Sequence, residues 1–252
     1  NPRELIKMRT DNVMSTCFFS ATLHPIEYYL SLLGGDENCK VIILDSPFKK
    51  DNLQLLINPY ISTKYYDREN TKYQITDQIF AFISSGGKYM IYFPSYKYLE
   101  LVYQVFDKFN ETDFEIIKQN PYMTETERLD FINQFDETKK NIIGFAVLGG
   151  VFAEGIDLKG DKLNGVCIIG VGLPMFDDFR NELKLYFDEV YHKGYQYAYM
   201  YPGFNKVLQA VGRVIRDESD LGKALLIDNR YLNKEYLQLY PKHWSHYRIL
   251  KL

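Results

Sequence analysis

The residues best suited to chemistry lie in the segment 204–216, which contains Gln209, Arg213 and Arg216. Wound as an α-helix at about 100° per residue, the segment places these three side chains on one face and its apolar side chains on the opposite face. Arginine stays charged and can bind two phosphate oxygens at once. The spacing predicts a nucleotide-phosphate site; the alternative is an amphipathic surface helix whose arginines are only solvated. Because glycine costs about 1 kcal/mol inside a helix, we also expect another backbone to pass close to Gly212.

A hydroxyl group stands at the end of the predicted strand 88–93. Pro94 ends that strand, and Ser95 begins the next predicted helix. Ser95 either only caps the helix, which stabilises it by about 1 kcal/mol, or also contacts a phosphate, because a helix N-terminus presents free N–H groups.

A glycine-rich loop follows the predicted strand 141–148. Gly150 and the glycine before it allow the backbone to approach a ligand closely. Two acids, Glu154 and Asp157, stand on either side of Gly155. Carboxylates in such a loop can bind a ribose hydroxyl, hold a water or a metal ion, or pair with the arginines. The alternative is a plain loop with solvated acids.

The composition indicates a globular chain. Its 252 residues are 46% hydrophobic and 25% charged, with a net charge of −3, so a sizeable core is expected and disorder is not. The three cysteines, Cys17, Cys39 and Cys167, form no Cys-x-x-Cys pair. This pattern indicates neither a disulfide framework nor a metal site, and it favours the reducing cytoplasm. No apolar run approaches the roughly 18 residues that a membrane span needs.

Apolar periodicity predicts the order of the elements. Strands are predicted at 13–19, 40–45, 88–93, 114–118, 141–148, 165–171 and 223–228. Helices are predicted at 25–33, 71–85, 99–109, 124–135, 179–191, 204–216 and 232–239. Between the predicted strand 40–45 and the predicted helix 71–85, residues 46–70 are predicted to form a long connection that could include one irregular strand.

Alternation of strands and helices indicates a parallel sheet with helices on both faces, because parallel strands need a crossover between them. No linker or repeat divides residues 71–240, so we expect one α/β domain with an N-terminal lead-in. Ligands of such sheets bind at the carboxyl ends of the strands.

Half of a nucleotide site is missing from this sequence. It contains no Gly-x-x-x-x-Gly-Lys-[Ser/Thr] motif and no acidic pair directly after an apolar strand, which are the usual phosphate and Mg²⁺ ligands. The arginines are therefore expected to be exposed and to act on a phosphate that another domain holds.

Four motifs, in this order, resemble those of one family. They are Ser-Ala-Thr-Leu at 20–23, Tyr-Phe-Pro-Ser-Tyr at 92–96, Phe-x-Glu-Gly-Ile-Asp-Leu-x-Gly at 152–160, and Gln-Ala-x-Gly-Arg-x-Ile-Arg at 209–216. Their order and spacing resemble motifs III to VI of superfamily 2 helicases of the XPD/DinG family. The resemblance implies a RecA-like fold, which is a three-layer sandwich of the P-loop NTPase type with a mostly parallel sheet.

The resemblance also implies a partner domain. The family has two RecA-like domains with ATP and Mg²⁺ between them, and this chain resembles the second domain. Many members also carry an iron–sulfur cluster, which lies outside that second domain. Residues 1–22 then form a lead-in from the first motor domain, and residues 23–252 form the C-terminal motor domain. The implied activity is ATP-dependent 5′→3′ unwinding of DNA in repair or replication, with the chain alone inactive.

Roles for individual residues follow from the same resemblance. Arg213 and Arg216 would contact the γ-phosphate of ATP as catalytic residues, with Arg216 the better candidate for an arginine finger. The remaining cleft residues would be Gln209, Glu154, Gly155 and Asp157. Contacts to the backbone of single-stranded DNA would come from Ser95, Gly150 and Phe152.

Two other readings of the sequence stay open. The chain could be a non-catalytic RecA-like module that binds nucleic acid or a protein, or part of a translocase or nuclease-associated subunit that does not unwind. The aromatic residues between 174 and 204 could stack on nucleic-acid bases or simply fill a core.

Overall fold

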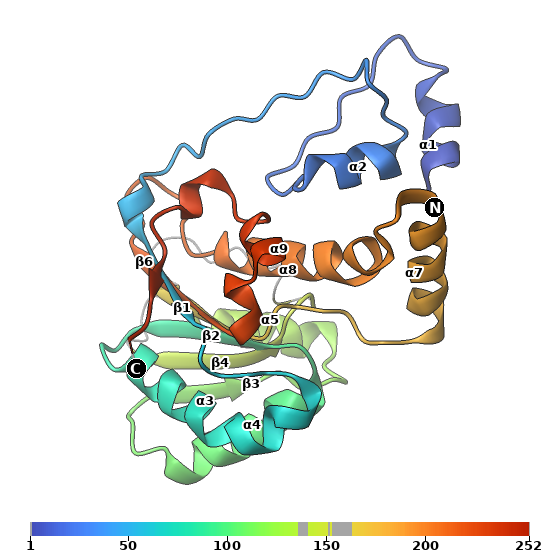
Figure 1. Cartoon of the computed structure of the whole chain (residues 1–252). Helices are drawn as coiled ribbons and strands as arrows, with labels where there is room; N and C mark the ends of the chain where they lie inside the picture. Colours follow the sequence, from blue (N-terminus) through green and yellow to red (C-terminus); the bar gives the residue numbers. More distant parts are fainter. Residues whose placement is uncertain (1, 136–140, 151, 153–162, 252) are drawn as a thin grey trace.

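The computed structural model describes residues 2–135, 141–150, 152 and 163–251. Within these ranges, seven strands form one parallel sheet in the order β3-β4-β2-β5-β6-β1-β7, with helices on both faces (Figure 1). The strands are β1 (Leu53–Asn58), β2 (Lys88–Phe93), β3 (Glu115–Lys118), β4 (Ile142–Val147), β5 (Gly165–Ile169), β6 (Gly222–Ile227) and β7 (Arg248–Ile249). The predicted parallel sheet between helices is confirmed.

Each face of the sheet packs against its own helices. α3 (Arg68–Ile83) and α4 (Tyr96–Phe109) bury their apolar stripes on one face, together with alternate β2 residues such as Ile91. α8 (Tyr201–Val211) packs on the other face, where Tyr92 points. Every residue of β2 is buried, which explains why its sequence after Lys88 is a continuous apolar run and not an alternating one.

Two helices near the N-terminus form a small unit on the α8 side of the molecule (Figure 1). α1 (Arg3–Thr10) lies against α2 (Ile26–Leu33), and the Arg3 guanidinium donates to the Ser31 carbonyl at 3.0 Å. The predicted boundary between residues 22 and 23 therefore falls between two helices that contact each other.

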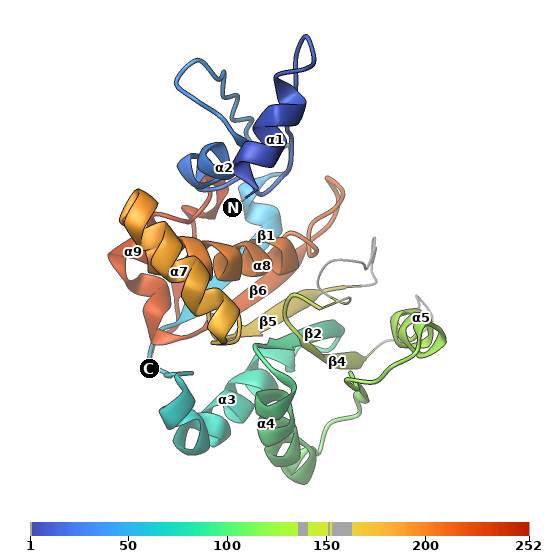
Figure 2. The same ribbon diagram turned by 90° about the vertical axis from the view of Figure 1, so that its right-hand side faces the viewer.

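Aromatic rings join this unit to the rest of the molecule. Tyr28 of α2 meets Tyr197 edge-on, with ring centres 4.9 Å apart. Tyr197 belongs to a π-helix (Gln196–Met200) that runs directly into α8, and α7 (Asp178–Tyr191) packs against that π-helix (Figure 2).

Local sequence signals predicted most elements well. β2 spans the predicted residues, and β3 to β6 lie within two residues of their predicted bounds. α5 (Glu125–Asn133) begins with the predicted capping box: the Glu127 N–H donates to the Thr124 hydroxyl at 3.3 Å, and the Thr124 N–H donates to the Glu127 carboxylate at 2.7 Å.

Two predicted strands are wrong. Residues 13–19 and 40–45 form no strand and pair with no described strand, and Figure 1 draws both as thin irregular segments. The exposed fractions of Ile42 and Leu44 are 82% and 85%. β-branched side chains favour a strand only where a neighbouring strand and a core can receive them. The connection 46–70, by contrast, contains the regular strand β1, which pairs with both β6 and β7.

The arginine-bearing helix also ends earlier than predicted. α8 stops at Val211, and Gly212 forms its C-cap, with its N–H bonded to the Leu208 carbonyl at 2.9 Å. Tight turns follow, so Arg213 and Arg216 lie beyond the helix and not on one of its faces. The predicted last helix is shorter too, since α9 covers only Lys234–Leu237.

Close backbone approach occurs at another glycine of the same helix. A Cβ on Gly203 would lie 3.0 Å from the Gly172 carbonyl oxygen and 3.0 Å from the Leu173 nitrogen. Among the described residues, a Cβ on Gly212 would meet carbonyls of its own turn, so no other described backbone makes the approach expected there. The Gly172–Gly203 contact is where α8 crosses the chain leaving β5.

We expect Gly203→Ala to lower the free energy of unfolding by about 1–3 kcal/mol, because the new methyl group must push two backbones apart. Urea unfolding followed by circular dichroism measures the loss. Gly212→Ala is the matched control: Gly212 is exposed and has an ordinary φ of −63°, so its change should stay within about 0.5 kcal/mol. A larger loss in the control would contradict this account.

Candidate functional site

Two of the predicted site segments meet at the carboxyl edge of the sheet. Ser95 follows β2, and Gly150 follows β4, which is hydrogen-bonded to β2 (Figure 2). The Leu148 N–H donates to the Phe93 carbonyl at 2.8 Å, so the two exits stay in register. Ser95 also caps α4, because its hydroxyl oxygen accepts from the Tyr98 N–H at 3.3 Å.

The buried side-chain amide of Gln119, which the sequence analysis did not identify, joins the segments that follow β2 and β4. Gln119 is 7% exposed. Its Oε1 accepts from the Val147 N–H at 2.8 Å, and its Nε2 donates to the Tyr96 hydroxyl at 2.8 Å. Gln119 therefore fixes the end of β4 relative to the first residue of α4. A glutamine directly after a predicted strand was the available signal.

The glycine turn after β4 lies against α8. Gly149 has a φ of +77°, which favours glycine. A Cβ at this position would lie 2.5 Å from Cδ of Lys206. The turn that follows β4 is therefore in contact with the helix that leads to the two arginines.

Phe152 is a core residue in this structure. Its side chain is fully buried, its ring centre lies 4.2 Å from that of Phe131, and its carbonyl accepts from the Tyr92 hydroxyl at 2.8 Å. The Phe152 side chain is therefore unavailable to nucleic acid, and only its backbone atoms could make the predicted contact. Glu154, Gly155 and Asp157 lie outside the described residues.

The two arginines lie in the turn that follows α8. Both are half-buried, which corrects the expectation of exposed side chains. Burial raises the pKa of Tyr92, and the charge of Arg213 opposes that rise, so Arg213 lies near Tyr92. The N–H groups of Arg216 and Asp217 both donate to the Asp220 carboxylate at 2.8 Å. Asp220 thereby holds the backbone of the arginine turn.

Gln209 lies one helical turn before Arg213 and is half-buried. Its Oε1 is buried and accepts no hydrogen bond from the described part of the chain. A buried oxygen without a donor costs free energy unless a ligand or another domain supplies one. This orphaned oxygen fits a residue that faces a bound group.

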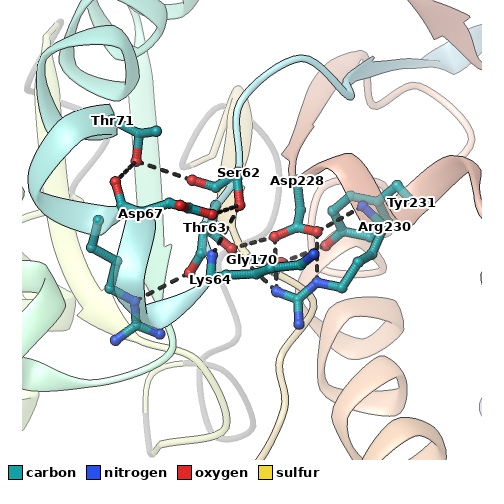
Figure 3. A network of polar contacts seen from close by, with 10 residues as sticks. Ser62, Thr63, Lys64, Asp67, Thr71, Gly170, Asp228, Arg230 and Tyr231 are labelled. Atoms are coloured by element: carbon teal, nitrogen blue, oxygen red, sulfur yellow. Dashed lines mark hydrogen bonds and ion pairs between the residues drawn. The ribbon is translucent and has the colours of Figure 1, made fainter.

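A second polar network lies at the carboxyl ends of β1, β5 and β6 (Figure 3). Asp228 is fully buried, and its carboxylate accepts from Arg230 Nε at 2.7 Å and Arg230 Nη2 at 2.8 Å. The Thr63 hydroxyl donates to the same carboxylate. The Tyr231 hydroxyl donates to the Gly170 carbonyl at 2.7 Å. The network joins the exits of three neighbouring strands.

An additional cation connects this network to the Ser95 turn. Arg68 Nε donates to the Thr63 carbonyl at 3.2 Å, and the guanidinium carbon lies 4.2 Å from the centre of the Tyr98 ring. Tyr98 is in the first turn of α4, which Ser95 caps. Burial lowers the pKa of Arg68, but an arginine in a protein stays protonated at neutral pH. The sequence signals missed here were an Asp-x-Arg that begins at the last residue of the predicted strand 223–228 and an arginine at the start of α3.

Among the described residues, no three His, Cys, Asp or Glu side chains gather as a metal site would require. In the same part of the chain, no helix is both long and apolar enough to cross a membrane.

Comparison with known proteins gives the class of this fold and then its family. A solved XPD helicase structure matches 100% of the chain over 46% of its own, with a TM-score of 0.73 at 21% identity. The fold is therefore the RecA-like fold of helicase motor domains. The sequence profile of the Helicase C-terminal domain family matches residues 79–247. The chain belongs to this family.

Curated relatives narrow the type of helicase domain. The ATP-dependent DNA helicase chl1 of Schizosaccharomyces pombe is 25% identical over 97% of the chain and 32% of its own length. The 3′-5′ exonuclease DinG of Staphylococcus saprophyticus is 25% identical over 98% of the chain and 27% of its own length. The chain is thus a helicase C-terminal domain of the XPD/DinG type, and it spans about a third or less of these relatives.

Replacing Asp228 with asparagine should destabilise the domain, because the Arg230 charge loses its buried partner. We expect a loss of about 3 kcal/mol, the lower end for a buried pair, since the Arg230 side chain is 20% exposed and regains some water. Denaturant unfolding measures the change.

Glu100→Gln serves as the control for the loss of one carboxylate charge. Glu100 and Lys118 are 2.8 Å apart but lie at the surface, with exposed fractions of 47% and 34%. That pair should contribute less than about 1 kcal/mol. Equal losses in the two variants would show that Asp228 is not a buried anchor.

Proposed function

We propose that this chain is the second motor domain of an ATP-dependent DNA helicase that contacts DNA at the carboxyl edge and ATP through its arginine turn. The observation that carries the proposal is the meeting of the Ser95 cap and the Gly149–Gly150 turn on neighbouring strands. Free N–H groups of a helix start suit phosphate oxygens, and a glycine turn lets the backbone approach them closely. The partner would be single-stranded DNA, bound through Ser95, Gly150 and the Phe152 backbone.

The ATP side of the proposal rests on the turn after α8. Arg213 and Arg216 would bind γ-phosphate oxygens of ATP, while Mg²⁺ and the other phosphates are held by a first motor domain. Gln209 fits a residue facing the nucleotide because its Oε1 is buried without a donor in the described residues. Glu154, Gly155 and Asp157 would line the same cleft. ATP would supply the phosphoanhydride bond whose hydrolysis drives movement.

Closure of the two domains would be coupled to ATP because the arginines gain their phosphate contacts only when the domains meet. A ligand shifts a conformational equilibrium only by its differential affinity for the two states. Hydrolysis would remove the γ-phosphate contact and let the domains separate.

We further propose movement in the 5′→3′ direction and a role in DNA repair or replication. We also propose a cytoplasmic location, which suits the free cysteines Cys17, Cys39 and Cys167.

One relative favours a second candidate function. The similarity to a 3′-5′ exonuclease DinG is compatible with a motor domain in a nuclease-associated protein that does not unwind. Strand-displacement, translocation and exonuclease assays on the intact protein distinguish the candidates. Translocation or nuclease activity without strand displacement would favour the second.

Arg216→Ala in the intact protein should leave ATP binding near normal and reduce DNA-stimulated turnover by about 10³–10⁵-fold, the usual contribution of an arginine finger. ATP affinity and steady-state hydrolysis are measured side by side. Arg248→Ala removes an exposed arginine from the edge strand β7 and should change neither. Normal turnover in Arg216→Ala would refute the assignment.

Ser95 can be tested by separating its cap from its proposed DNA contact. Asparagine and aspartate both cap helices well, so Ser95→Asn and Ser95→Asp should fold with similar stability. Only aspartate places a negative charge against a phosphate, which should weaken single-stranded DNA binding by about tenfold or more relative to asparagine. Fluorescence anisotropy measures the affinities. Equal affinities would mean that Ser95 serves as a cap alone.

A further inference from the structure

The aromatic residues between 174 and 204 separate into two groups in the structure. Tyr197 and Tyr199 are buried, as core residues are. Phe176 and Phe179, which follow the exit of β5, have exposed fractions of 63% and 71%. Exposed aromatic rings are the kind of side chain on which unpaired bases stack.

Phe176 differs from Phe179 because it ends a column of rings. Its ring stacks on that of Tyr199, with centres 4.6 Å apart and planes 26° apart. Tyr199 stacks in turn on Tyr195, with centres 5.8 Å apart and planes 25° apart. The Tyr199 hydroxyl donates to the Asn181 carboxamide oxygen at 2.9 Å, which holds the middle ring in place. One face of Phe176 is therefore supported from behind, and much of the ring remains exposed.

The position of this column places it on the proposed nucleic-acid side of the molecule. Phe176 follows β5, which pairs directly with β2, the strand that ends before Ser95. The exits of β4, β2 and β5 are thus consecutive along one edge of the sheet. A nucleic-acid strand whose backbone is bound at Ser95 and Gly150 would run along the same edge, from which the chain leads to Phe176.

The charges around Phe176 select which part of a nucleotide it meets. The next two residues are Asp177 and Asp178, and the Asp177 carboxylate caps α7 by accepting from the Arg180 N–H at 2.7 Å. Two carboxylates repel a phosphate but not the neutral face of a base. A flat, supported ring beside acids therefore suits a base whose phosphates are bound elsewhere.

We propose that Phe176, supported by Tyr199 and Tyr195, is a stacking platform for one unpaired base of single-stranded nucleic acid. This inference rests on the proposed function and adds a base contact to its phosphate contacts. Every base has a π-face, so the platform accepts any sequence. Because stacking neutralises no phosphate, its contribution does not depend on salt, unlike that of a backbone contact.

Phe176→Ala in the intact protein should weaken binding of a single-stranded oligonucleotide by about 5- to 100-fold, the range for one stacked base. The slope of log affinity against log salt should stay unchanged. Phe176→Trp should bind as tightly as the native protein, and DNA should quench the new indole emission. Trp244, the one tryptophan of this 252-residue sequence, is 2% exposed, and the new emission is read as the difference between Phe176→Trp and the native protein.

Phe179→Ala is the matched control, because its ring is as exposed but stacks on no ring of the described residues; its effect should be below twofold. Unchanged affinity of Phe176→Ala, or equal losses in both alanine variants, would overturn the platform. A reduced salt slope would also overturn it, since it would indicate a phosphate contact. Failure of the native protein to bind DNA would instead refute the proposed function.

Discussion

Parallel pairing of the described strands is the constraint on which the rest of the structure depends. Because β4, β2, β5 and β6 run in one direction and in register, their carboxyl ends meet at one edge. Segments that are 50 or more residues apart, such as the Ser95 turn and the Gly149–Gly150 turn, become neighbours there. The segments that follow the strands do not hold the sheet together, since backbone hydrogen bonds and apolar packing on both faces do so.

Ending several strands at one edge creates a need for buried polar anchors. Backbone groups at such an edge leave the ladder, and unpaired buried groups are costly. Gln119 receives the Val147 N–H on one side of the edge, and Asp228 receives the Arg230 N–H at 2.7 Å on the other. Both side chains are buried. These anchors fix the positions of partly buried residues, such as Ser95 and Arg68, at this edge.

The sequence predicted those elements whose signals are local. β2 is a short apolar run between Gly87 and Pro94, and the Thr124–Glu127 box marks a helix start within four residues. Residues 40–45 have an equally good strand pattern, yet they are exposed, because a strand also needs a neighbour that no local pattern reveals. The helix through Arg216 was overextended since apolar spacing continued past Gly212, where the backbone turns. The Asp228 network combines the nearby Arg230 with Thr63 and Gly170, which only the topology brings to it.

α8 connects the two halves of the site in physical terms. It touches the exit of β5 at Gly203 and the exit of β4 at Lys206, and it ends at the turn that carries Arg213. An 11-residue helix is stiff over this distance, so the positions of the two edge turns and of the arginine turn depend on one another. The Gly172–Gly203 contact leaves no room for adjustment by side chains, since neither residue has one. Under the proposed function, α8 would be a rigid link between the turns that contact DNA and the turn that contacts ATP.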